Sequence, residues 1–381
     1  MKQSCRGMAR WCLRVLCIAS ALTATCAYAQ GSRYVVIDQD AMGPAGTDMN
    51  SILVFLQAPN VKVLGITVPT GDGWRNEEVA HALRLLELMG RTDIPVVPGA
   101  SSPLIRTKQW TQAWEQMHGK ISYQGAWSSF RPNHAPDEIP PMREGSPTTK
   151  PDEEGAAHFL IRMVHTHPHQ VTIYAAGPMT DIAQAITLDP QFAELAEELV
   201  IMGGSVNPHT DDPEFVDDPR HEFNLWFDPE ASSMTLHAHW AKITATTVDV
   251  SIETHLTNEM LQKLRQTHST AAQYIARYTE RKSGDLDYMW DELAAAAWLD
   301  PSLITRERYV YMDVSLEKGG SYGDTLVWSE ADKPALDLQK VHMQMDVDSV
   351  RFEKFFLGLM SSPTPHALHP QLPQEPVARA H

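Results

Sequence analysis

The chain has 381 residues, of which 43% are hydrophobic and 21% charged, and its formal net charge at pH 7 is −17. This composition excludes a disordered, collagen-like or disulfide-stapled polypeptide, and the length buries enough apolar surface to fold without a metal or a disulfide. An acidic surface repels phosphate backbones and anionic headgroups, so we expect no nucleic-acid partner. A small neutral ligand or a cation fits this charge better.

All four cysteines lie within the first 26 residues: Cys5, Cys12, Cys17 and Cys26. The same stretch has basic residues first, then the apolar run Val15–Leu22, then Ala27–Ala29. This order is typical of a secretory signal peptide, residues 1–29, that is cleaved after Ala29. The alternatives are a buried N-terminal helix and a lipoprotein anchored at Cys26. We expect an exported protein, periplasmic or extracellular, with no membrane segment after cleavage.

Downstream of residue 33, short apolar runs alternate with longer segments of helical spacing. The pattern predicts strands at 34–37, 61–68, 95–97, 171–175 and 198–202, and helices at 51–57, 76–89, 156–165 and 180–185. Repeated strand–helix–strand units predict an α/β fold with a mostly parallel, mixed sheet and helices on both faces. Ligands on such sheets bind outside the carboxyl ends of the strands, so the chemistry is expected there.

Two proline-rich stretches interrupt this alternation. Residues 128–155 contain six prolines and no apolar periodicity, which predicts a long loop, either a lid over a site or a mobile segment. Residues 361–381 are also rich in proline and lack a core-forming run, which predicts a disordered tail. The predicted strands on both sides of the first stretch belong to one sheet, so we expect a single domain over residues 33–360.

Acidic residues gather where the first predicted strand ends. Asp38 and Asp40 lie two residues apart and face the same side of an extended chain, and a turn containing Gly43 and Gly46 lets Asp48 fold back toward them. Hard oxygen ligands with a majority of carboxylates suit Ca²⁺ or Mg²⁺. The alternative is a set of solvent-facing loop aspartates with Asp48 as a helix N-cap. The residues alone leave both interpretations open.

This segment resembles the opening signature of the inosine-uridine-preferring nucleoside hydrolase family, which reads D-x-D-x-G-x-D-D. Further segments resemble that family and occur in its order: 63–72, 95–100, 176–183, 200–204, 222–224, 228–231 and 290–291. Each motif is weak by itself, but the ordered set is specific. The resemblance implies a nucleoside-hydrolase-like fold with a Rossmann-like core. It also implies hydrolysis of the N-glycosidic bond of ribonucleosides through an oxocarbenium-like transition state.

The resemblance further implies a calcium site. In that site Asp40 is a metal ligand and the general base that takes a proton from the attacking water, with Asp38 as a supporting ligand. The backbone carbonyl of Ala176 and the side chain of Asp291 complete the coordination. The alternative for Asp291 is the cap of a helix that begins at Glu292.

The same resemblance assigns the residues that bind substrate, a small-molecule nucleoside. Asp48 binds one ribose hydroxyl, and Glu222 and Asn224 bind the hydroxyls on the other side of the ring. Asp72 stands at the place of a family asparagine and is a further substrate-binding candidate. Without the family pattern, residues 221–226 would equally fit a strand with polar side chains facing water. Members of the family are commonly homo-oligomers, and the same is expected here.

The chain departs from the family pattern at the metal site. Four more residues separate Asp40 from Gly46 than in the family spacing. Met49 replaces the second of the paired aspartates, and a thioether does not hold a hard cation. Asn50 follows directly, and we expect it to supply the missing oxygen.

A second departure concerns the leaving base. Trp290 stands where many members carry a histidine that protonates the base, and an indole cannot act as an acid near neutral pH. Trp290 is therefore expected to stack on the base, with Trp127 and Trp226 as further candidates whose alternative is core packing. Activation of the leaving base would then come from a loop residue such as His118 or Tyr123, from solvent, or from the intrinsic quality of the leaving group. Together the departures allow a second hypothesis, a secreted protein on this fold that binds nucleosides or ribose without cleaving them.

Overall fold

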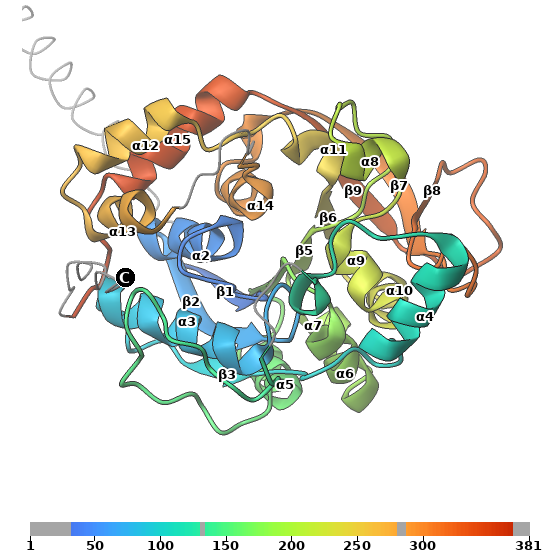
Figure 1. Cartoon of the computed structure of the whole chain (residues 1–381), viewed down its shortest axis with the longest axis horizontal. Coiled ribbons are helices and arrows are strands. Elements are labelled where there is room, and N and C mark those ends of the chain that lie inside the picture. Colours follow the sequence, from blue (N-terminus) through green and yellow to red (C-terminus); the bar gives the residue numbers. More distant parts are fainter. Residues whose placement is uncertain (1–31, 130–133, 280–286, 369–381) are drawn as a thin grey trace, which may run out of the picture.

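The computed structural model describes residues 32–129, 134–279 and 287–368. Its centre is one nine-stranded sheet in the order β3-β2-β1-β4-β5-β6-β9-β7-β8 (Figure 1). The strands are β1 (Arg33–Asp38), β2 (Val61–Val68), β3 (Val96–Pro98), β4 (Val171–Ala175), β5 (Glu198–Met202), β6 (Ile243–Thr246), β7 (Ile304–Val314), β8 (Thr325–Trp328) and β9 (Lys340–Val347). Neighbours from β3 to β9 pair in parallel, and β7 is antiparallel to both β9 and β8.

Helices cover both faces of the sheet (Figure 1). They are α2 (Thr47–Gln57), α3 (Arg75–Met89), α4 (Lys108–His118), α5 (Ala156–Thr166), α6 (Thr180–Leu188), α7 (Phe192–Leu195), α8 (Pro213–Asp217), α9 (Phe223–Phe227), α10 (Pro229–His237), α11 (Val248–Ser251), α12 (Asn258–Arg265), α13 (Thr270–Tyr278), α14 (Trp290–Leu299) and α15 (Ser349–Met360). Successive side chains of a strand point to opposite faces. Accordingly Val35 and Ile37 of β1 pack in the core shared with α2, α3 and α12 to α15, whereas Val36 packs with α5, α6 and α10. The predicted α/β architecture is confirmed.

The predicted elements agree closely with the observed ones where apolar runs are long. The expected strands at 61–68, 171–175 and 198–202 coincide with β2, β4 and β5. Residues 221–226 form no strand, because Glu222 caps the short helix α9. Strands that precede and follow the loop at 128–155 join the same sheet.

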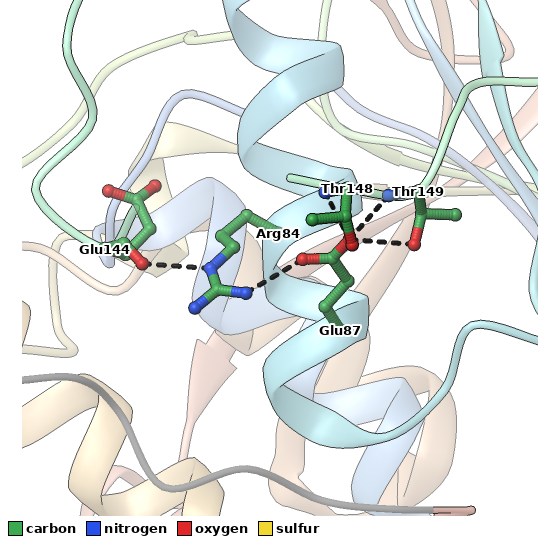
Figure 2. A network of polar contacts seen from close by, with 5 residues as sticks. All are labelled: Arg84, Glu87, Glu144, Thr148 and Thr149. Carbon is green, nitrogen blue, oxygen red and sulfur yellow. Dashed lines mark hydrogen bonds and ion pairs between the residues drawn. The ribbon is translucent and has the colours of Figure 1, made fainter. Parts of the chain in front are cut away.

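The proline-rich loop packs against helix α3 (Figure 2). Arg84 donates from Nε to the backbone oxygen of Glu144, 2.9 Å, and from Nη1 to Glu87 Oε2, 2.8 Å. Glu87 Oε1 accepts hydrogen bonds from the backbone and hydroxyl of both Thr148 and Thr149, at 2.6 to 2.8 Å. Burial opposes ionisation of Glu87, but the hydrogen bonds from Thr149, Arg84 and Thr148 prevail and lower its pKa to about 2. The loop is therefore anchored by a buried carboxylate.

Both ends of the chain lie partly or wholly outside the described residues. The expected signal peptide, 1–29, is outside them, and so are residues 369–381 of the expected disordered tail. In the first part of that tail, Leu368 donates its backbone N–H to Gly90 O, 2.8 Å, and Pro365 O accepts from Arg91. Within the described ranges, no helix combines the length and apolar character needed to cross a membrane.

The chain order of the strands positions a crevice at β1. From β1 the chain builds β2 and β3 on one side and then returns to place β4 on the other side of β1. In such sheets, the carboxyl ends of the strands flanking this switch point form the ligand crevice. Asp38 at the end of β1 pairs with Thr67 of β2 and with Ala175 of β4, so the segments that follow these three residues meet at one edge.

Candidate active site

Asp40 lies just beyond β1 and is 2% exposed. Its Oδ2 accepts a hydrogen bond from the backbone N–H of Asp72, 2.9 Å. A Cβ atom at Gly71 would approach Asp40 Oδ2 to 2.1 Å, and one at Gly177 would approach Oδ1 to 2.6 Å. Only glycine allows the backbone to come this close to the carboxylate. The loops after β2 and β4 therefore hold Asp40 in one position.

The turn after Asp40 brings Asp48 back, as the sequence predicts. Gly46 has a φ of 91°, a left-handed conformation, and directly precedes α2. Asp48 in the first turn of α2 accepts a hydrogen bond at Oδ2 from the backbone N–H of Met42, 3.0 Å. Asp48 is 5% exposed and remains beside the end of β1.

Asp291 reaches the same place from the far end of the chain. It lies in the first turn of α14, which begins at Trp290, so it does not cap a helix beginning at Glu292. Its Oδ2 accepts from Gln39 Nε2, 3.0 Å, and its backbone N–H donates to Thr47 Oγ1, 2.9 Å. Gln39, between the two aspartates at the end of β1, thus orients the Asp291 carboxylate through a contact that no local sequence pattern predicts.

Glu222 and Asn224 are fixed at the end of β5. Glu222 Oε1 accepts from the backbone N–H of Asn224, 2.8 Å, and its Oε2 accepts from those of Gly204 and Leu225, 2.9 and 3.0 Å. Asn224 Nδ2 donates to Met202 O, 3.1 Å. Glu222 thus caps α9 while its carboxylate faces the crevice.

A cavity of 280 Å³ unites most of the predicted site residues. Those that line it are Asp40, Asp48, Asp72, Ala176, Glu222, Asn224, Trp290 and Asp291. The lining residues to which the sequence analysis gave no role are Thr47, Met202, Glu214, Phe215, Phe223 and Val248. Tyr123 also lines the cavity.

The structure does not bring Asp38 and Asn50 to this cavity. Asp38 is fully buried, accepts from Thr67 Oγ1 at 2.5 Å, and has Asp181 as its charged neighbour. Asn50 Nδ2 donates to Glu292 Oε1, 3.0 Å, and Asn50 lines a neighbouring hollow of 720 Å³. Each residue of an α-helix is rotated by about 100° from the last, so Asn50 points away from the face that presents Asp48. Met49 is buried in the core.

Residues 35–355 match the sequence pattern of the family described as inosine-uridine preferring nucleoside hydrolase. The chain belongs to this family. It is 30% identical to probable uridine nucleosidase 2 of Arabidopsis thaliana, over 64% of this chain and 67% of the relative. It is 25% identical to the inosine-uridine preferring nucleoside hydrolase of Leishmania major, over 83% of this chain and 94% of the relative. The family that the motifs indicate is confirmed.

A solved structure has the same fold. The purine-preferring ribonucleoside hydrolase from Gardnerella vaginalis superimposes with a TM-score of 0.67 at 23% identity, over 86% of this chain and 98% of the other. The nine-stranded sheet described above is thus the nucleoside hydrolase fold.

The carboxylates of this nucleoside hydrolase repel one another. Burial raises the pKa of Asp40 well above its ordinary value, and the charges of Asp72, Asp48, Glu78 and Asp291 raise it further. Burial is likewise the main cause that raises the pKa of Asp48 and of Asp291. Acids this close together are stabilised by a bound cation or by retained protons.

Aromatic rings form part of the cavity wall: Tyr123, Phe215, Phe223 and Trp290. Trp290 is half-buried; its ring centroid lies 5.8 Å from that of Phe215 and 4.3 Å from that of Tyr288. Of the three candidate tryptophans, Trp290 lines the cavity, whereas Trp127 and Trp226 are buried.

The two candidate acids named from the sequence are separated by the structure. Tyr123 lines the cavity, with its ring centroid 5.1 Å from that of Phe223. His118 ends α4, packs against Trp114 at 4.9 Å and does not line the cavity.

Proposed function

We propose that this nucleoside hydrolase cleaves ribonucleosides to free base and ribose with Ca²⁺ bound beside Asp40. The observation that carries the proposal is the single cavity at the carboxyl ends of β1, β4 and β5, lined by Asp40, Ala176 and Asp291 together with Glu222 and Asn224. Family membership supports the reaction, and the donor chemistry supports the metal.

The residues present fit a hard cation. Asp40 and Asp291 offer carboxylate oxygens and Ala176 a backbone carbonyl, which are ligands that Ca²⁺ prefers. In the described part of the chain, no three His, Cys, Asp or Glu side chains are arranged to hold a metal ion. The proposed ligand set therefore has two carboxylates and a backbone carbonyl, with Met49 at the place of a further family carboxylate. When bound, Ca²⁺ would lower the pKa of a coordinated water.

The protein's own side chains supply the rest of the chemistry. Asp40 takes a proton from the water that attacks the anomeric carbon. Asp48, Asp72, Glu222 and Asn224 line the cavity as acceptors for ribose hydroxyls. A substrate without these hydroxyls leaves buried polar groups unpaired, which gives the site its demand for ribose.

The decisive experiment incubates the full chain with a nucleoside panel plus Ca²⁺ and measures released ribose and free base. Hydrolysis that disappears in Asp40→Asn supports the proposal. Tight nucleoside binding without released ribose would instead support the alternative, a binding protein on this fold. Removal of Ca²⁺ by EDTA tests the metal separately.

The proposal also includes export from the cytoplasm and assembly into a homo-oligomer. The acidic, cysteine-free chain after residue 29 supports secretion after cleavage at Ala29, and N-terminal sequencing of the protein recovered outside the cytoplasm tests it. A homo-oligomer, by analogy with the family, is tested by light scattering.

A further inference from the structure

A carboxyl group that the reaction described above does not use lines the catalytic cavity. Glu214 lies on α8, is half-buried, and shares the cavity with Asp40. Asp212 fixes the start of this helix, because its Oδ1 accepts the backbone N–H of Glu214, 3.1 Å. The next residue, Phe215, contacts Trp290 on the aromatic wall. Glu214 therefore lies near the part of the cavity expected to hold the base.

We propose that Glu214 is the general acid that protonates the departing nucleobase. The proposal rests on the proposed function, because it assigns a residue to the second proton transfer of that reaction. Trp290 of α14 cannot act as an acid, and Glu214 of α8 would supply the proton in its place.

The surroundings of Glu214 keep its proton near neutral pH. Burial, together with the charges of Asp212, Glu222 and Asp72, raises the pKa of Glu214 to about 7. Asp212 caps the start of the helix that carries Glu214, Glu222 precedes α9, and Asp72 lies in the loop after β2. Tyr288, which precedes α14, also lies close enough to feel the charge of Glu214. The charged residues that line the described cavity are all acidic.

The proton balance of the reaction is complete with these two carboxyls. Asp40 accepts one proton from water as the hydroxyl oxygen bonds to the anomeric carbon. The N-glycosidic bond breaks, its electron pair goes to the base, and the carboxyl of Glu214 gives its proton to a base nitrogen or oxygen. Afterwards the proton on Asp40 leaves to solvent, and Glu214 takes one up, so the net reaction is hydrolysis.

The test compares two leaving groups in the full chain. Inosine needs a protonated base, whereas p-nitrophenyl riboside releases a stable anion. Glu214→Gln keeps the shape of the side chain and removes the acid, and general acids contribute about 10²–10⁴-fold. We expect kcat on inosine to fall by at least about 10²-fold and kcat on p-nitrophenyl riboside to change by less than about threefold. The basic limb of the inosine pH profile, near pH 7 in the parent, should disappear.

A conservative variant supplies the matched control. Asp212→Asn keeps a helix cap but removes a negative charge beside Glu214, so the pKa of Glu214 falls and the basic limb moves to lower pH while turnover persists. Equal losses of Glu214→Gln on both substrates, or no loss on inosine, overturn the assignment of Glu214. An unchanged limb in Asp212→Asn also counts against it. A parent that cleaves neither substrate overturns the proposed function instead.

Discussion

Gln39 Nε2 donates a hydrogen bond to Asp291 Oδ2 across 3.0 Å, and this contact joins the end of β1 to the start of α14. Both side chains are buried, with Gln39 0% and Asp291 3% exposed. The contact sets the direction of the Asp291 carboxylate, one of the proposed metal ligands. It also explains why an amide stands between Asp38 and Asp40.

Replacing Gln39 with Leu is expected to weaken calcium binding by about 10- to 100-fold, the usual cost of losing a group that orients a metal ligand. Calorimetric titration of Ca²⁺ measures this directly. Gln57→Leu is the matched control, because Gln57 is also buried but donates to Leu359 O and Ser362 O at the other end of α2. Equal calcium affinity of parent and Gln39→Leu would contradict the positioning role.

Asp40→Asn and Asp291→Asn are each expected to reduce turnover by about 10³-fold or more, because both remove charge from the cation site and Asp40 is also the base. Ribose release from inosine measures the loss. Asp346→Asn is the surface control, since Asp346 forms an exposed ion pair with Arg306 of β7 and does not line the cavity, and its activity should match the parent. Near-parent turnover in Asp40→Asn would exclude the mechanism.

Calcium is expected to stabilise the native protein, because carboxylates that repel one another are relieved by a cation. At a concentration 100 times Kd, binding adds roughly 2.7 kcal/mol to the free energy of unfolding. At roughly 2 °C per kcal/mol for a domain of this size, Tm should rise by about 5 °C. Differential scanning calorimetry with Ca²⁺ and with EDTA checks this, and Asp291→Asn should lose the shift. A Tm that changes with neither Ca²⁺ nor EDTA argues against a metal site.

Trp290→Ala is expected to raise KM for nucleosides by about tenfold, which corresponds to about 1.4 kcal/mol of lost stacking. Trp290→Phe keeps an aromatic face and should stay close to the parent. Steady-state kinetics on inosine and uridine measure both. If the Ala variant has the parent's KM, Trp290 serves only to pack against Phe215 and Tyr288.

Glu87 is expected to make stability depend on acid pH. Its pKa is about 2 in the folded protein against an ordinary 4.5, so its ionised form stabilises the fold above pH 4.5 and loses this effect as pH falls toward 2. Glu87→Gln should therefore lower the free energy of unfolding by about 2 kcal/mol at pH 7, with a smaller difference at pH 3.

Urea unfolding at the two pH values measures that difference. Glu154→Gln is the control, because Glu154 forms an exposed pair with Arg162 and should change stability by less than about 1 kcal/mol. A Glu87→Gln deficit that is the same at both pH values would show that its hydrogen bonds, rather than its charge, anchor the loop.

The sequence by itself indicated the mostly parallel α/β class, the strands β1 to β5 and the acidic motif, whereas β6 to β9 and the order of the strands came only from the structure. Strands such as β2 and β4 are continuous apolar runs bounded by turn residues. Because such strands are buried on both faces, a short stretch of sequence is enough to predict them. The return of Asp48 toward the end of β1 could also be predicted, because Gly46 marks the turn within the same segment.

Only the tertiary structure decided which side chains share the cavity. Asn50 follows Asp48 closely in the chain, yet the helical rotation of α2 turns it toward Glu292. Gln39 finds its partner Asp291 on a helix, at a position 252 residues later in the chain, and Glu214 lies in the site on a short helix without apolar periodicity. Contacts between segments so far apart in the chain depend on how the elements pack, and no local pattern encodes them.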